Sequence, residues 1–388
     1  QTAQLEVKPV LNGTGRTAQA VVSSEDLKKA LEAAKLDSAG NKTVTIIVSE
    51  VKGVEQYALE LPKTSVTSVQ TNLLKIDSPV ATIIVPGNLF NTKDVKGDKV
   101  EISIGTGDKS KVRDESAAKT IGDRPVIEIK ASADGKALNL GNPQTAVTVS
   151  LDYKPTAGEL KNYEHITVWA IDENGNTRPV PSGKYDAETG QVTFTAQSFG
   201  NYAVVYVNKT FNDLNNYLWA KEKIEVMAAK GIINGTSETT YSPAKNITRA
   251  DFVVLLVNAL GLNAAPGGNF EDVNKDSYYY NAVAIAKELG IVTGVGNNKF
   301  NPAESISRQD MMVIAANAMK VAGKAISNGS ASDIAGFKDR ELVSAHAEAA
   351  AAALVKAGII TGSGNALNPQ KTATRAETAV IIYNIYNK

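Results

Sequence analysis

Three arginines stand at equivalent places in three similar stretches of the sequence, and each is expected to open a helix. Arg249, Arg308 and Arg375 lie in the segments Thr-Arg-Ala-Asp, Ser-Arg-Gln-Asp and Thr-Arg-Ala-Glu. A hydroxyl residue followed three positions later by an acid predicts a capping box, which makes each Arg the first helical residue. A solvated cation there opposes the helix dipole at a cost of roughly 0.3–1 kcal/mol. We therefore expect an anion site, where free N–H groups and a fork-shaped guanidinium converge on a carboxylate or phosphate.

A second interpretation of these arginines is that each forms a surface ion pair. The candidate partners are the acid two positions later and the aspartates Asp213, Asp272 and Asp339. Because the Arg recurs in all three segments, the anion-site interpretation is favoured over an isolated ion pair.

The arginines belong to a repeat that fills the C-terminal half of the chain. Each copy opens with Phe-x-Asp at Phe211, Phe270 or Phe337, continues through Gly-Ile-x-x-Gly and a hydrophobic-x-Pro turn, and reaches its Arg at the same spacing. The first Gly predicts the end of one helix, the Pro predicts a loop, and the capping box predicts the start of a second helix. One such hairpin cannot bury its own apolar face, so three should assemble around a shared core. The predicted copies span residues 208–266, 267–332 and 333–388.

Residues 1–207 have a different pattern, which predicts a β-rich region. Short β-branched, often alternating runs lie at residues 43–48, 81–85, 100–104, 126–129, 146–151, 166–171, 191–194 and 202–207. One stretch, from Ser24 as N-cap to Lys35, has a single apolar helical face. We expect a mostly antiparallel, sandwich-like module, either whole or divided into two subdomains near residues 120–140. The predicted fold class is thus multidomain, β-rich and then all-α.

Composition limits the partners. The 388 residues include 41 Lys plus Arg and 41 Asp plus Glu, and this zero net charge argues against nucleic acid. The absence of cysteine removes disulfides and thiolate metal sites. No apolar run approaches the roughly 20 residues of a membrane span. With two histidines and no nucleophile elbow, P-loop or zinc-helix motif, we expect no enzyme, no cofactor and no metal.

The triplicate pattern resembles the S-layer-homology family, from residue 211 to about 388. The resemblance implies a pseudo-threefold prism of repeats whose grooves bind an anionic secondary cell-wall polymer through its pyruvate-ketal-bearing amino sugar. It implies that Arg249, Arg308 and Arg375 meet the ketal carboxylate, and that Gly235, Gly294 and Gly362 let backbone approach the sugar. It also implies that Asp213, Asp272 and Asp339 orient the Arg or accept sugar hydroxyls, and that Trp219 supplies an apolar wall.

The copies depart from the family pattern at the wall position. It holds Trp219 in the first copy, Tyr278 in the second and His346 in the third. Pairing each Arg with the wall residue of its own copy, we expect Arg249 and Arg308 to contribute more to polymer binding than Arg375.

Two classes of function follow. The first is a secreted structural protein, held at the wall or S-layer of a Gram-positive-type bacterium, with room for self-assembly with other surface-layer subunits. Residues 1–207 then resemble a β-rich module found beside such repeats, on the segments Ile121-Gly122-Asp123-Arg124-Pro125-Val126, 147–153 and 201–204. The alternative is a surface enzyme or carbohydrate-binding module in residues 1–207, tethered by the repeats. A deep pocket with two converging carboxylates would favour the enzyme.

Overall fold

The computed structural model describes residues 3–13, 15–140, 145–324 and 326–388. The chain divides into two compact units, Gln1–Val207 and Asn208–Lys388. Each unit has its own large apolar core. Among the described residues, no helix combines the length and the apolar character needed to cross a membrane.

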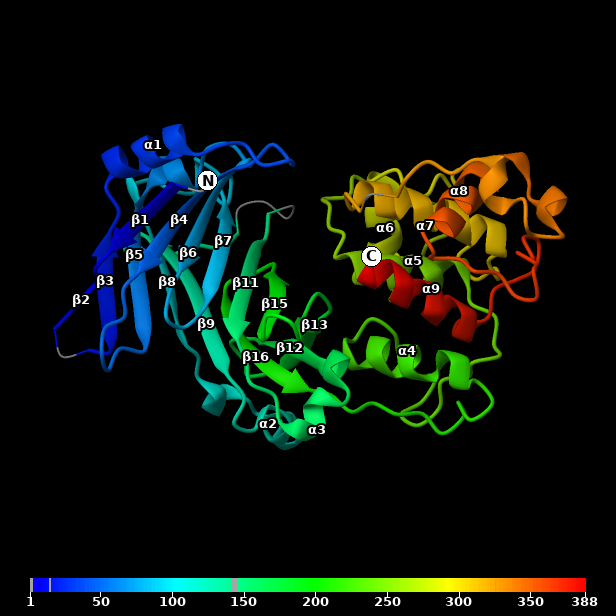
Figure 1. Cartoon of the computed structure of the whole chain (residues 1–388), viewed down its shortest axis with the longest axis horizontal. Coiled ribbons are helices and arrows are strands. Elements are labelled where there is room, and N and C mark those ends of the chain that lie inside the picture. Colours follow the sequence, from blue (N-terminus) through cyan, green and yellow to red (C-terminus); the bar gives the residue numbers. More distant parts are fainter. Residues whose placement is uncertain (1–2, 14, 141–144, 325) are drawn as a thin grey trace. The chain divides into compact units, whose positions relative to one another are not determined.

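Two β-sheets with a shared core form the N-terminal unit (Figure 1). In the described residues, the seven-stranded sheet has the order β1 (Ala3–Val7), β4 (Lys42–Val48), β6 (Asn72–Asp77), β7 (Thr82–Pro86), β11 (Val147–Asp152), β15 (Gln191–Ala196) and β14 (Lys184–Asp186). The nine-stranded sheet has the order β13 (Thr177–Val180), β12 (Ile166–Ile171), β16 (Gly200–Tyr206), β9 (Val126–Ala133), β8 (Lys99–Thr106), β5 (Gln56–Pro62), β3 (Thr17–Val21) and β2 (Val10–Leu11), with β10 (Lys136–Ala137) paired to β9. Alternating residues such as Ile102 and Ile104 on β8 point into this core.

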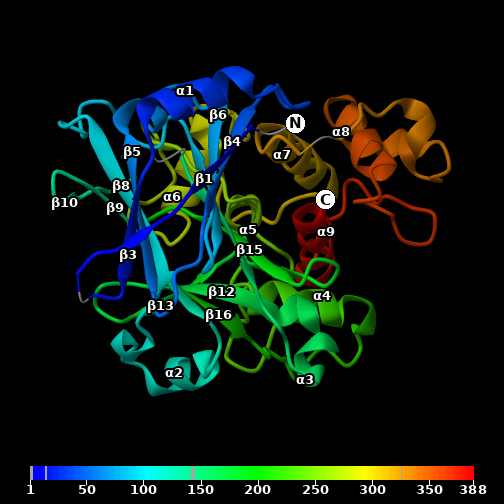
Figure 2. The same cartoon turned by 60° about the vertical axis from the view of Figure 1, so that its left-hand side comes forward.

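Short helices close the two ends of this sandwich. Helix α1 (Ser24–Ala33) lies at one end, whereas α2 (Glu115–Ile121) and α3 (Ala157–Leu160) lie at the other (Figures 1 and 2). Short 3₁₀ turns occur at Lys63–Ser65, Lys109–Lys111 and Tyr163–His165. The prediction of Ser24 as the cap of α1 was one residue late, because the hydroxyl of Ser23 accepts the N–H of Asp26 at 3.0 Å.

The expectation of mostly antiparallel pairing needs one correction, since both sheets are mixed. Strand β4 pairs in parallel with β1 and with β6, and β3 pairs in parallel with β5. Between β3 and β6 the chain alternates between the two sheets, so each strand that returns to a sheet runs in the same direction as its predecessor there. Parallel neighbours need such a crossover connection, which here passes through the opposite sheet. The remaining pairs are antiparallel, including the ladder from β5 through β8 to β9.

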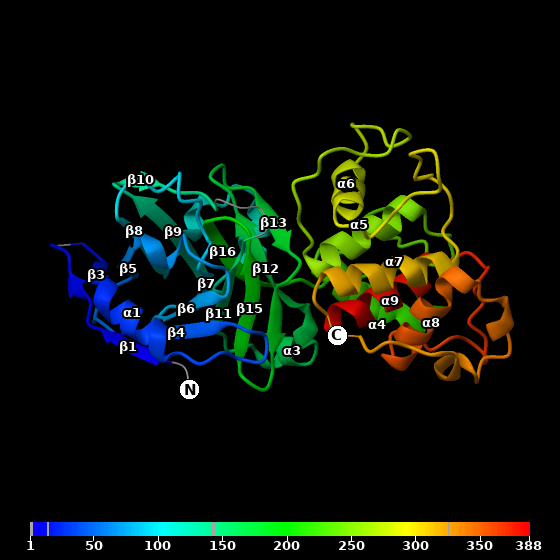
Figure 3. The same cartoon turned by 90° about the horizontal axis from the view of Figure 1, so that it is seen from above.

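The C-terminal unit is built from three helix–loop–helix copies. Its helices are α4 (Leu218–Ala229), α5 (Arg249–Leu260), α6 (Tyr280–Glu288), α7 (Arg308–Val321), α8 (Ala345–Lys356) and α9 (Arg375–Asn387), with 3₁₀ turns at Ala331–Ile334 and Arg340–Leu342. Helix α5 contacts α7 and α9, and the first helix of each copy packs on the second helix of another: α6 on α5, α8 on α7 and α4 on α9 (Figure 3). One apolar core therefore draws on all three copies.

The second helix of each copy begins where the sequence predicts, although of the three expected capping boxes the complete one is that of the third copy. The hydroxyls of Thr248, Ser307 and Thr374 accept the N–H of the residue three positions later, so all three predicted N-caps are confirmed. At Thr374 the carboxylate of Glu377 also accepts the N–H of the cap residue, which completes the box.

Candidate functional site

The three copies close a ring of backbone contacts, and the arginines lie at its junctions. The N–H of Arg249 donates to Glu304 (2.8 Å), that of Arg308 to Lys371 (2.9 Å) and that of Arg375 to Lys245 (2.8 Å). The first copy thus bonds to the second, the second to the third, and the third back to the first. Each Arg is consequently shared between its own copy and a neighbour.

The guanidinium of each Arg also holds the neighbouring copy. Its Nε donates to the carbonyl oxygen that begins the hydrophobic-x-Pro turn: Arg249 to Phe300 (3.0 Å), Arg308 to Leu367 (2.7 Å) and Arg375 to Tyr241 (2.9 Å). Arg249 and Arg375 also lie over the ring of the same residue, with Cζ 5.0 and 4.5 Å from the centroid. One edge of every guanidinium is therefore occupied within the fold.

The aspartates of Phe-x-Asp bind the same turn from inside their own copy. Each accepts two consecutive backbone N–H groups: Asp213 from Tyr241 and Ser242 (2.9 and 2.7 Å), Asp272 from Phe300 and Asn301 (2.8 and 2.8 Å), and Asp339 from Leu367 and Asn368 (2.8 and 2.7 Å). Burial raises the pKa of Asp272 and Asp339, but the N–H donors outweigh it and hold both below the usual value. The aspartates thus position the Arg through the turn, rather than by touching it.

The second glycine of Gly-Ile-x-x-Gly has a packing role in each copy. A Cβ added to Gly235, Gly294 or Gly362 would lie 2.6, 2.7 or 2.5 Å from the ring of the Phe that opens the same copy. Gly294 and Gly362 also have positive φ values of 78° and 70°. Close packing against Phe211, Phe270 and Phe337 therefore requires these glycines, whatever approaches them from outside.

The free edges of the three guanidinium groups differ. Nη1 of Arg308 forms an ion pair with Glu377 at 3.0 Å, and Nη2 of Arg375 donates to the carbonyl oxygen of Asn234 at 2.7 Å. For Arg249, no hydrogen bond or ion pair within the described part of the chain uses the terminal nitrogens. Arg249 is nevertheless only 8% exposed. A buried cation without an acidic partner is costly, so this position is the one most in need of an anion.

A groove of about 260 Å³ opens beside Arg249 and draws on all three copies. Its lining includes Arg249 from the first copy, Gly294, Asp310 and Asn317 from the second, and His346 from the third. Nε2 of His346 lies 3.1 Å from Oδ1 of Asp310. We call this the Arg249 groove. In this groove the structure brings together one predicted Arg, Arg249, and one predicted Gly, Gly294, from neighbouring copies.

The residues at the wall position are Trp219, Tyr278 and His346, and their neighbours in the structure differ from those expected from the sequence. Tyr278 and Trp219 are 75% and 55% exposed, on or next to the helices that pack across copies. The hydroxyl of Tyr278 donates to the carboxylate of Asp251 in the first copy. The exposed Tyr278 thus contacts the first copy, whereas His346 shares a groove with Arg249. For His346, the pairing of a wall residue with the Arg of its own copy does not hold, because this side chain from the third copy lines the groove of Arg249 from the first.

The family model of the S-layer homology domain matches residues 210–253, 269–312 and 336–379. Over 376 residues, 96% of this chain, the sequence is 29% identical to an amylopullulanase of Thermoanaerobacterium thermosulfurigenes, covering 19% of that protein. It is 36% identical to an exoglucanase of Acetivibrio thermocellus over 56% of this chain and 20% of the relative. It is 30% identical to the surface-layer 125 kDa protein of Lysinibacillus sphaericus over 51% of this chain and 16% of the relative. The chain therefore spans a fifth or less of each of these curated relatives.

Proposed function

Because the chain carries three S-layer homology domains, which indicate a bacterial cell-surface, wall-associated location, we propose that its C-terminal unit anchors it to an anionic cell-wall polymer. The single observation that supports this most is Arg249. It is buried, its terminal nitrogens have no partner among the described residues, and it lines an open groove. A carboxylate or phosphate on the polymer would complete a charge-assisted, two-pronged contact there.

The polymer group that suits this site is a carboxylate on a sugar, such as the pyruvate ketal of an amino sugar. The Arg249 groove offers a guanidinium edge for the carboxylate, and Asn317, Asp310 and His346 as hydrogen-bonding groups for hydroxyls. Arg308 differs because Glu377 already neutralises its charge, and Arg375 differs because the carbonyl oxygen of Asn234 occupies one of its terminal nitrogens. We therefore propose unequal sites, with the Arg249 groove as the principal one.

Co-sedimentation of the full chain with purified wall polymer tests this proposal. The polymer is used before and after chemical removal of its pyruvyl groups, at low and at high salt. We expect binding to the native polymer, weaker binding at high salt and strong loss after removal. Equal binding to both polymers would rule out the ketal carboxylate, and binding that is insensitive to salt would rule out the charge-assisted contact.

For residues 1–207 we propose a non-catalytic role, although the alignment with the amylopullulanase extends over this unit. A strongly buried carboxylate lines a large pocket of this unit, that of Glu128. Both of its oxygens are engaged by protein donors, which does not suit an acid catalyst. Incubation of the full chain with starch, xylan and cellulose should release no reducing sugar. Hydrolysis that is lost on Glu128→Gln would instead support a surface enzyme.

A further inference from the structure

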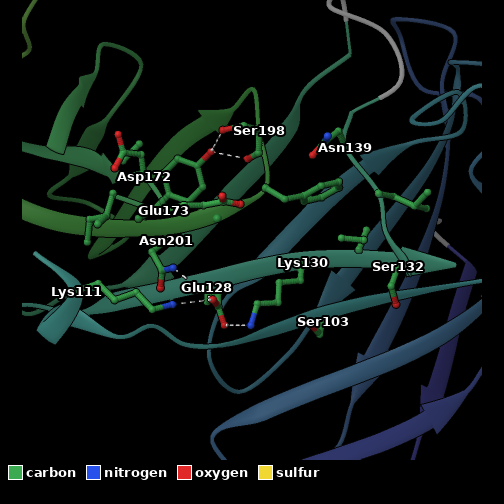
Figure 4. A pocket seen from close by; sticks show the side chains of 18 of the residues that line it. Ser103, Lys111, Glu128, Lys130, Ser132, Asn139, Asp172, Glu173, Ser198 and Asn201 are labelled. Carbon is green, nitrogen blue, oxygen red and sulfur yellow. Dashed lines mark hydrogen bonds and ion pairs between the residues drawn. The ribbon is translucent and has the colours of Figure 1, made fainter. Parts of the chain in front are cut away.

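A large pocket on the nine-stranded sheet of the N-terminal unit lies outside the anchoring repeats. Its volume is about 670 Å³, within the range of small-molecule sites. Figure 4 shows two walls: Lys111, Glu128, Lys130, Ser103 and Ser132 on one side, and Asp172, Glu173, Ser198 and Asn139 on the other. We call it the Glu128 pocket.

The carboxylate of Glu128 organises the first wall. It is 8% exposed, and Oε2 accepts from Lys130 Nζ (2.6 Å) and Gln56 Nε2 (3.2 Å). Oε1 accepts from Asn201 Nδ2 (3.3 Å) and lies 3.8 Å from Lys111 Nζ. Two ammonium groups and two amides are thus held around one buried anion. Lys111, Lys130 and Asn201 also line the pocket, so they can offer further N–H groups to a bound molecule.

The backbone of β8 makes this arrangement possible. Gln56 on β5 reaches Glu128 on β9 across the intervening Gly105, and a Cβ there would lie 2.4 Å from the Gln56 side chain. Likewise, a Cβ at Gly107 would lie 2.7 Å from Oδ1 of Asn201. Gly105 on β8 and Gly107, just beyond the end of that strand, therefore keep space for the side-chain amides of Gln56 and Asn201. Simple strand stability would not require them, because glycine weakens a strand.

The second wall adds acceptors and an apolar surface. Glu173 forms no hydrogen bond or ion pair with the described residues, while Asp172 is occupied by the N–H groups of Asn174 and Asn176 in its own turn. Phe199 and Leu138 are half-buried parts of the lining. Burial raises the pKa of Tyr202, so its hydroxyl stays protonated beside Ser198.

We propose that the Glu128 pocket binds a short neutral oligosaccharide. Its charged lining mixes both signs, with Glu101, Glu128, Asp172 and Glu173 against Lys111, Lys130 and Arg178. A polyanion would need an excess of cations, and a polycation an excess of free acids. Sugar hydroxyls both donate and accept, so they satisfy the ammonium groups of one wall and the carboxylate of the other. The apolar C–H face of a sugar ring suits Phe199 and Leu138.

This site is independent of the anchoring grooves, and calorimetry on the full chain can separate the two. The probes are maltotetraose, cellotetraose, xylotetraose and the β-1,4-linked tetramer of N-acetylglucosamine, none of which carries a carboxylate. We expect at least one to bind saturably. Lys130→Ala should weaken that binding roughly tenfold by removing a charged donor. Ala137→Trp, on the exposed rim of the pocket, should abolish it by filling the space.

Matched controls make the outcomes decisive. Lys161→Ala and Ala39→Trp change exposed residues outside the pocket and should bind like the parent protein. Arg249→Ala should also leave oligosaccharide binding intact while impairing polymer binding. Unchanged melting temperatures would show that the pocket variants remain folded. The proposal fails if no probe binds at millimolar concentration, if Ala137→Trp binds normally, or if Arg249→Ala abolishes oligosaccharide binding.

Discussion

Arg375 and Tyr241 lie 134 positions apart in the sequence and form three contacts with each other. The guanidinium lies over the Tyr241 ring at 4.5 Å, its Nε donates to the Tyr241 carbonyl oxygen at 2.9 Å, and the Tyr241 hydroxyl donates to the Arg375 carbonyl oxygen at 3.0 Å. The same Tyr241 N–H is held by Asp213. This cluster joins the third copy to the first.

Removal of one of these contacts should destabilise the C-terminal unit measurably. In Tyr241→Phe, the buried hydroxyl is lost and the Arg375 carbonyl oxygen loses a donor, so we expect a decrease of about 1–3 kcal/mol in the free energy of unfolding. Urea titration followed by circular dichroism at 222 nm would measure it. Tyr279 is half-exposed, and its hydroxyl forms no hydrogen bond with the described residues, so Tyr279→Phe should have little effect. Equal effects in the two variants would contradict the assigned contact.

The three arginines should contribute unequally to polymer binding. All three Arg→Ala variants lose the same Nε bond to a neighbouring turn, so that structural loss is common to the set. Arg249→Ala also removes the guanidinium whose terminal nitrogens have no partner among the described residues, and we expect it to weaken binding tenfold or more, roughly the value of a charged hydrogen bond. Arg308→Ala should have the smallest effect, because Glu377 already neutralises that cation. Calorimetry would rank them, and Arg308→Ala as the most damaging variant would contradict this order.

A gain of affinity should follow from release of Arg308. Glu377→Gln removes the charge that pairs with Arg308 yet keeps a side chain able to complete the cap at Thr374. We expect polymer binding to strengthen by up to about tenfold at low salt, and the gain to shrink as salt screens the new site. Glu348→Gln alters an exposed acid on α8 and serves as the control for net charge. A similar gain in both variants would mean that only net charge matters.

Acid should loosen the hydrophobic-x-Pro turns. The pKa values of Asp272 and Asp339 are lower in the folded state than in ordinary peptides. Their contribution to stability is therefore present above the unfolded pKa of about 4 and is lost as the pH falls through the folded values. For the parent protein, the urea concentration at the midpoint of unfolding should decrease as the pH is lowered from 7 to 4 and then to 3. Asp272→Asn should be less stable at pH 7 and show a smaller pH dependence; an unaltered pH dependence would place the effect at other carboxylates.

Features encoded over a few residues could be predicted from the sequence. The spacing from Thr374 to Glu377 gave the helix start, and the β-branched run from Ile166 to Ile171 gave β12 with its observed bounds. These elements depend on local hydrogen bonds and on the alternation of side chains, and both can be read from a few consecutive residues of the sequence.

Features that depend on distant partners could not be predicted. Strands β3 and β5 pair in parallel because the chain crosses to the opposite sheet between them. The alternation of apolar and polar residues within a strand does not reveal such a crossing. The meeting of His346 with Arg249 requires three copies in one groove. Glu377 did carry a signal, because it stands where the other copies have Asp251 and Asp310. Its longer side chain reaches Arg308 of the neighbouring copy.

The ring of backbone contacts also bears on the order in which the chain can complete its fold. The turn at Tyr241 remains without its partner until residue 375 is available, because the bond that closes the ring comes from the last helix. Contacts between residues that are so far apart in the sequence slow folding, because the intervening chain must lose entropy before the contact can stabilise the fold. The first copy therefore acquires its final bonds only when the last helix of the chain is in place.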